Sequence, residues 1–219
     1  MTRPSTGTST GIFFPALGSY HAFARQCAAL IKQRILNLLF PASDTIHLLD
    51  GFPIPVCHAC RGHRCRTFRG DAAWSYCATK KEHFYGLRGH LVITLAGTAV
   101  AFTVTAANVD ERDVVPNLHD KIRGLLIGDK GFISGDLKLE AAAHDIDLQT
   151  PLRQNMPDGR DPGAVARLMR TRRAVETAIG KLSEMFAAQT TKARDLPGFV
   201  NRMARKLLAY NFSLMSTQS

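Results

Sequence analysis

The sequence has no apolar run that approaches the roughly 20 residues needed to cross a bilayer, which argues against a membrane-spanning protein. Its first 20 residues hold one basic residue and an apolar patch broken by Pro15 and Gly18, which makes a poor signal peptide. The five cysteines are an odd number, and without an export signal they do not predict a disulfide framework. We therefore expect a cytoplasmic protein, whose 219 residues suffice for one sizeable core with an appendage.

The net charge is +10, and acidic residues are scarce in the last third of the chain. Residues 46–150 balance 12 Lys/Arg against 12 Asp/Glu, whereas residues 151–219 hold 12 Lys/Arg and only 5 Asp/Glu. Such an asymmetry favours a polyanionic partner, nucleic acid before membrane, because no amphipathic segment has a strong Trp/Phe face. A solvated basic helix face is the alternative interpretation.

Apolar periodicity and turn residues predict an N-terminal helix, followed by strands that alternate with helices. The predicted elements are a helix at 20–39, a strand at 45–51, a β-hairpin at 85–108 around Gly97-Thr98, a short capped helix at 110–122, a strand at 125–129, a helix from Ser134 to about His144, a strand at 146–150, and helices at 164–186 and after Pro197. This order predicts an α/β fold with a mixed sheet flanked by helices.

Two of the predicted strands end in an aspartate, Asp50 in "HLLDG" and Asp129 in "LLIGD". In a sheet of this kind, polar site residues gather at strand ends beside a chain reversal. Two neighbouring carboxylates repel each other, but together they form a strong site for a hard divalent cation, which takes oxygen ligands. The alternative is two unrelated surface aspartates.

A third acid is found in the predicted helix at 164–186, where Glu176 lies at the edge of the apolar stripe. Arg172 and Arg173 precede it by four and three residues and so share its face of the helix. The simple interpretation is an intrahelical ion pair. The sharper one is a carboxylate metal ligand, with flanking arginines that hold phosphates.

Four segments resemble the catalytic core of bacterial insertion-sequence transposases of the DDE class: "HLLDGFPIPVC", "HFYGLRGHLVIT", "LLIGDKGFIS" and "RTRRAVETAIGKLSEMF". The resemblance covers roughly residues 11–216, and the Asp-Lys-Gly-aromatic and Arg-x-x-x-Glu blocks are its specific parts. It implies a ribonuclease-H-like fold in which Asp50, Asp129 and Glu176 bind two Mg²⁺ ions, with Mn²⁺ as a substitute. It also implies strand cleavage and strand transfer on double-stranded DNA, both element ends and target, by a homo-oligomer at the nucleoid.

The resemblance also suggests a division of the chain. Residues 44–219 are expected to form the catalytic domain, and residues 1–43 a short helical remnant. Relatives have a longer helical N-terminal part that recognises the element's ends, whereas fewer than 50 residues precede Asp50 here, which predicts an N-terminally truncated copy. The chain also departs from many relatives by Met169 in place of tyrosine and Ser183 in place of lysine.

A rival pattern, "CHACRGHRC", places Cys57, Cys60 and Cys65 close together, with Cys77 later, and could bind zinc. The alternative is a basic segment with incidental thiols, in which Arg61, Arg64 and Arg66 contact the DNA backbone. Lys130, beside Asp129, is a further predicted DNA contact, together with Arg172 and Arg173. Two other functions stay open: a DNA-binding remnant of a transposase that no longer catalyses, and a zinc-dependent nucleic-acid-binding module. His90 is expected to be a packed strand residue.

Overall fold

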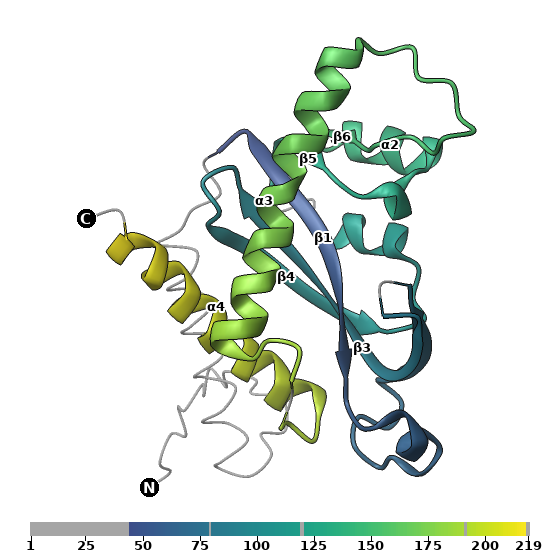
Figure 1. Ribbon diagram of the computed structural model, residues 1–219, viewed down its shortest axis with the longest axis vertical. Coiled ribbons are helices and arrows are strands. Elements are labelled where there is room, and N and C mark those ends of the chain that lie inside the picture. The colour runs from purple at the N-terminus through teal and green to yellow at the C-terminus, as the bar shows by residue number, and fades with distance from the viewer. Residues whose placement is uncertain (1–43, 79, 119–120, 191, 218–219) are drawn as a thin grey trace, which may run out of the picture.

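The computed structural model describes residues 44–217 except 79, 119, 120 and 191, and its frame is a six-stranded mixed sheet (Figure 1). The strands are β1 (Ile46–Pro55), β2 (Ala73–Cys77), β3 (Glu82–Thr94), β4 (Ala99–Ala106), β5 (Gly124–Ile127) and β6 (Ile146–Gln149). β1 lies between β3, to which it is antiparallel, and β5, to which it is parallel. β5 pairs in parallel with β6, and β3 also pairs with β2 and β4. The predicted mixed sheet is confirmed.

Helices cover both faces of this sheet (Figure 1). They are the 3-10 helices η1 (Ala59–Arg64), η2 (Glu111–Leu118) and η3 (Lys130–Phe132) and the α-helices α2 (Gly135–Ala142), α3 (Pro162–Phe186) and α4 (Leu196–Thr217). α3 and α4 pack on one face, and η2 and α2 pack on the other. Of the helices described, none combines the length and the apolar character that a membrane span requires.

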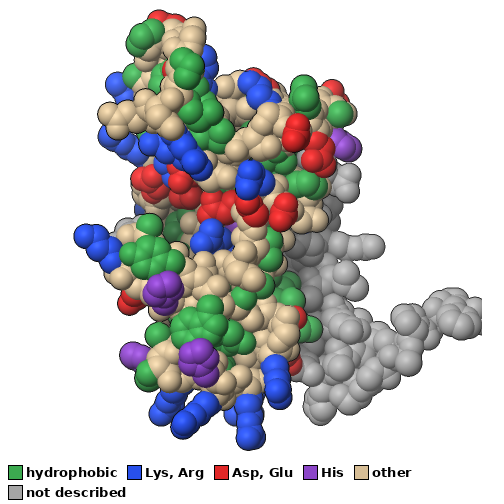
Figure 2. Space-filling view, turned by 90° about the vertical axis from the view of Figure 1, so that its right-hand side faces the viewer, with side chains coloured by type: hydrophobic (Ala, Val, Ile, Leu, Met, Phe, Trp, Pro, Cys, Tyr) green, Lys and Arg blue, Asp and Glu red, His purple; other side chains and the backbone are tan. Residues whose placement is uncertain are grey.

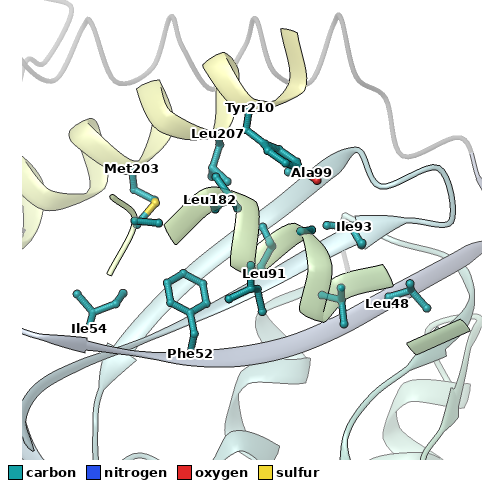
Figure 3. Close-up of a cluster of buried hydrophobic side chains, with 14 of the residues drawn as sticks. Leu48, Phe52, Ile54, Leu91, Ile93, Ala99, Leu182, Met203, Leu207 and Tyr210 are labelled. Carbon is teal, nitrogen blue, oxygen red and sulfur yellow. The ribbon is translucent and has the colours of Figure 1, made fainter. Parts of the chain in front are cut away.

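The alternation of side chains along β1 divides the core into two clusters, because successive strand residues point to opposite faces. Leu48 faces α3 and α4, whereas its neighbour Leu49 faces η2 and α2, and both are fully buried. Figure 3 shows the first cluster, in which sheet residues such as Leu91 meet Leu182 of α3 and Leu207 of α4. This cluster holds α3 across the sheet and so fixes where Glu176 lies.

Most predicted elements are confirmed, including the hairpin of β3 and β4, the helix α3 and the Ser134 cap of α2, whose Oγ accepts from the Leu137 amide. Three differ. The strand predicted to end at Gly51 continues to Pro55, because its second half pairs with β3. The helix predicted at 110–122 is the 3-10 helix η2, which contains Pro116. The strand β2 was not predicted, and the predicted helix at 20–39 lies outside the described residues.

Candidate active site

The parallel pairing of β1 with β5 brings Asp50 and Asp129 side by side. Leu48 is the register partner of Ile127, and each aspartate follows its partner residue by two positions. Asp129 was predicted to end its strand, but β5 ends two residues earlier, at Ile127. Asp50 lies within β1 opposite Leu91, so the prediction that it ends a strand was wrong. Asp50 lies just past the point where the pairing of β1 with β5 ends, and Asp129 lies just past the same point on the other strand. Both carboxylates are therefore at the same place on the sheet.

Helix α3 supplies the third carboxylate. Its buried residues Val175, Ala178, Ile179 and Leu182 form the stripe that packs on the sheet. Glu176 lies beside this stripe with 52% of its side chain exposed, and Arg172 lies one turn before it. The packing of α3 therefore directs both side chains toward the edge where the two aspartates meet.

Arg172 contacts all three carboxylates. Its Nη2 lies 3.6 Å from Asp50 Oδ2, and its Nη1 lies 3.4 Å from both Asp129 Oδ1 and Glu176 Oε1. The Arg172 side chain is only 14% exposed, and its buried Nε has no hydrogen-bond partner among the described residues. The sequence predicted the pair with Glu176 but not the contacts with the aspartates, which come from distant parts of the chain. The three acids thus converge on one guanidinium group.

Asp50 is the most confined of the three acids. Burial raises its pKa to about 6, against the attraction of Arg172 and the hydrogen bond that its Oδ1 accepts from the Gly51 amide at 2.8 Å. The nearby carboxylates of Asp129 and Glu111 raise the pKa of Asp50 further. Burial thus disfavours the charged form of Asp50, and a cation bound next to this carboxylate would favour it.

The donor atoms suit a hard divalent cation in kind, because all are carboxylate oxygens around one positive charge. They do not yet surround a common point: across the described part of the chain, no three His, Cys, Asp or Glu side chains stand close enough together to hold a metal ion. Arg172 occupies the centre of the acidic group. A divalent cation held by all three carboxylates would require the guanidinium group to move aside.

The other basic residues predicted to bind DNA lie outside this acidic group. Lys130 and Arg173 are exposed beside it, and Arg61, Arg64 and Arg66 are exposed in and after η1. Figure 2 shows acidic side chains gathered on one face with basic side chains next to them. More basic side chains project at the lower end of the molecule, where η1 lies in Figure 1. Arg172 alone of the predicted contacts is turned inward.

The cysteine-rich segment does not form a ligand cluster in the structure. All four are free thiols: Cys57, Cys60, Cys65 and Cys77. Among the described residues, they form no group of three with each other or with His, Asp or Glu side chains that could hold a metal ion. Cys65 Sγ lies 3.1 Å from Thr67 Oγ1, and its neighbour His63 packs against Trp74 with ring centroids 5.1 Å apart. The structure thus gives no support to the zinc alternative.

Two residues of the site were not identified from the sequence. Glu111, at the start of η2, pairs with Arg88 of β3, whose Nη1 lies 2.6 Å from Glu111 Oε1. The only signal in the sequence was a pair of acids in the first turn of a predicted helix, a common stabilising pattern.

His90 is fully buried on β3, as expected of a packed strand residue, and its Nε2 lies 3.2 Å from Thr105 Oγ1.

Comparison with known proteins adds a family. The family model of the transposase DDE domain matches residues 41–196, which is more than half of the chain. No curated protein matches the sequence.

Several solved structures show some likeness. The piggyBac transposase synaptic complex with hairpin DNA is 11% identical at a TM-score of 0.47, over 91% of this chain and 55% of that one. The Mos1 transposase catalytic domain with Raltegravir and Mn is 11% identical at a TM-score of 0.30, over 93% and 97%. A second structure, of the Mos1 mariner catalytic domain, is 12% identical at a TM-score of 0.28, over 94% of this chain and 97% of that one. This chain spans about half the length of the piggyBac protein.

Proposed function

Since the chain belongs to the family of transposase DDE domains, we propose that it cuts and joins DNA strands, with Asp50, Asp129 and Glu176 as its metal-binding carboxylates. The observation that carries this proposal is the convergence of three acids from β1, from the end of β5 and from α3 on Arg172. A purely structural ion pair needs one carboxylate, whereas three around one guanidinium leave negative charge in excess. That excess suits a site built to receive cations.

Mg²⁺, or Mn²⁺ in its place, would be held by these three carboxylates and would supply an activated water or 3′-hydroxyl and a stabilised leaving oxygen at phosphorus. The chain's own groups prepare the site. Arg172 balances part of the carboxylate charge before the cation binds. The packing of α3 on the sheet keeps Glu176 opposite the two aspartates.

Exposed basic residues on both sides of the acids would bind the DNA backbone. Lys130 follows Asp129 and Arg173 follows Arg172 in the sequence, and Arg61, Arg64 and Arg66 are exposed in and after η1. Phosphate contacts of this kind position a duplex without reading its sequence. Because an element has two ends and each chain carries one candidate site, we propose a homo-oligomer as the active form. Such a protein would work in the bacterial cytoplasm, at the nucleoid.

A plasmid-nicking assay with Mn²⁺ tests the carboxylates. We expect wild-type protein to nick supercoiled DNA only when the divalent cation is present. Asp50→Asn, Asp129→Asn and Glu176→Gln should each abolish nicking, because an amide lacks the anionic oxygen that the cation prefers. Glu184→Gln is the matched control, since Glu184 is the other acid of α3 and is exposed. Nicking that survives in either aspartate variant would refute the assignment.

The same variants separate catalysis from a structural role of Asp129. Asp129 directly precedes η3, at the N-cap position, but its side chain caps no backbone amide there. In metal-free buffer we therefore expect Asp129→Asn to melt at or slightly above the wild-type temperature. A markedly lower melting temperature with retained nicking would make Asp129 a scaffold residue. Salt-sensitive DNA binding by a wild-type protein that never nicks would favour the non-catalytic alternative.

A further inference from the structure

A fourth carboxylate lies beside the three predicted acids. Glu111 begins η2, after the strand β4, and 23% of its side chain is exposed. Arg88 of β3 donates from Nη1 to Glu111 Oε1 at 2.6 Å, a short charge-assisted hydrogen bond. Burial raises the pKa of Glu111, and the nearby carboxylate of Asp129 raises it further. Glu111 is therefore part of the same electrostatic environment as the two aspartates.

Two glycines explain where the Glu111 carboxylate lies. A β-carbon placed on Gly131 would overlap Glu111 Oε2, and one placed on Gly51 would meet Glu111 Oε1 at 3.5 Å. Neither glycine has a positive φ, so their backbone conformations do not require glycine. The missing side chains instead allow a close approach. Gly51 follows Asp50 directly and Gly131 follows Asp129 by two residues, so the Glu111 carboxylate lies between the two segments that carry the aspartates.

We propose that Glu111 is a positioning residue of the acidic site: held by Arg88, its carboxylate sets the separation of the Asp50 and Asp129 backbone segments. Arg88 is anchored in the middle of the sheet, where it lies opposite Pro53 of β1. The pair thus ties η2 to β3, and the Glu111 carboxylate in turn lies against Gly51 of β1 and Gly131 of η3. Glu111 acts through the aspartates, and this proposal rests on the proposed function, because the spacing matters only if the aspartates share a ligand.

A double-mutant cycle on the metal-free full-length protein tests the spacing. Gly131→Ala should lower the melting temperature in the wild-type background, because its β-carbon would overlap a Glu111 carboxylate that Arg88 holds in place. In the Glu111→Ala background the same substitution should cost much less, because the opposing carboxylate is gone. The cycle cancels the separate cost of leaving Arg88 without its partner.

Gly135→Ala serves as the matched control, since a β-carbon there meets no atom within 4 Å. Its effect should be the same in both backgrounds. If Gly131→Ala is also equally costly in both backgrounds, the Glu111 carboxylate does not lie against Gly131 and the proposal fails.

Mn²⁺ titration by calorimetry, without DNA, separates positioning from a merely structural role. We expect Glu111→Gln to weaken Mn²⁺ binding by ~10-fold or more, as for other groups that orient metal ligands. Glu140→Gln, an exposed acid of α2, should bind as the wild type does. Unchanged Mn²⁺ affinity in Glu111→Gln overturns the positioning role, even if the stability cycle shows coupling. A wild type that binds no Mn²⁺ refutes the proposed function instead, and the cycle then decides whether Glu111 spaces the two segments.

Discussion

Arg172 serves as the internal counter-ion of three carboxylates that come from three separate elements. Without it, Asp50 and Asp129 would face each other across a parallel strand pair with no charge between them. We therefore predict that Arg172→Ala lowers the stability of the metal-free protein by about 2 kcal/mol, because it leaves a partly buried acid without its partner. Added Mn²⁺ should then raise the melting temperature of the variant more than that of the wild type.

Arg173→Ala is the natural control for this prediction. Arg173 is the next residue along α3 and is exposed, so its loss should leave the melting temperature nearly unchanged. Melting curves of both variants with EDTA and with Mn²⁺ provide the comparison. Equal curves for the two variants would mean that Arg172 does not hold the acids together.

His90 provides a prediction about pH. Burial lowers its pKa to about 4, and the charge of Arg88 lowers it further, against an ordinary value of 6.5. A base whose pKa is depressed by folding contributes stability that is fully present above pH 6.5 and is lost as pH falls toward 4. We expect His90→Leu to reduce the loss in free energy of unfolding between pH 6.5 and pH 4 by up to about 3 kcal/mol.

Urea denaturation at several pH values between 4 and 7 measures that slope. His47 is also buried with a lowered pKa, and Asp50, whose pKa is raised to about 6, contributes a slope of the opposite sign, so a residual slope should remain in the variant. An unchanged slope in His90→Leu would show that His90 takes up its proton in the folded protein at ordinary pH.

At the scale of elements, the sequence could predict what depends on local pattern. The period of α3, the Ser134 cap and the Gly97 turn are local features, and all three were predicted correctly. The length of β1 was not, because its second half follows from pairing with β3, 30 to 40 residues away. The same limit applies to the site. Asp129 and Glu176 could be proposed from short motifs, but the contacts of Arg172 with Asp50 and of Arg88 with Glu111 depend on tertiary packing.

The element η1 presents Arg61, Arg64 and nearby Arg66, and it carries a built-in reporter. Gly62 of η1 lies so close to Trp74 of β2 that a β-carbon would overlap the indole ring, and Trp74 is the single tryptophan of the chain. We predict that binding of duplex DNA changes the intrinsic fluorescence. Replacing one of these arginines by alanine should lower the log–log salt slope of binding by about 0.9, the value for one lost phosphate contact.

Arg153→Ala is the matched control, because Arg153 is an exposed arginine outside the predicted DNA-binding set. Its salt slope should equal that of the wild type. If the three arginine variants behave like Arg153→Ala, the η1 segment does not touch the DNA backbone.

At the scale of the whole molecule, the basic residues of the C-terminal part differ in what they do. Six of them are exposed, and we predict that these supply much of the affinity for the DNA backbone: Arg167, Arg170, Arg173, Lys181, Arg202 and Arg205. Arg172 is turned toward the acids instead. Lys206 donates from Nζ to the Ala187 carbonyl at 2.6 Å, just past the end of α3. A positive charge at the carboxyl end of a helix stabilises that helix.

Arg205 and Lys206 therefore form a matched pair that separates DNA binding from folding. Arg205→Ala should reduce DNA affinity and the salt slope while leaving the melting temperature unchanged, because the exposed side chain only neutralises phosphate. Lys206→Ala should lower stability by about 1 kcal/mol, since the carbonyls at the end of α3 lose their donor, and should leave the salt slope unchanged. Filter-binding titrations between low and moderate salt, beside thermal melts, measure both quantities. Equal loss of DNA affinity in the two variants would place both Lys206 and Arg205 on the DNA.

Wild-type binding that does not weaken as salt rises would point to a partner other than nucleic acid, because counterion release makes every phosphate contact salt-dependent.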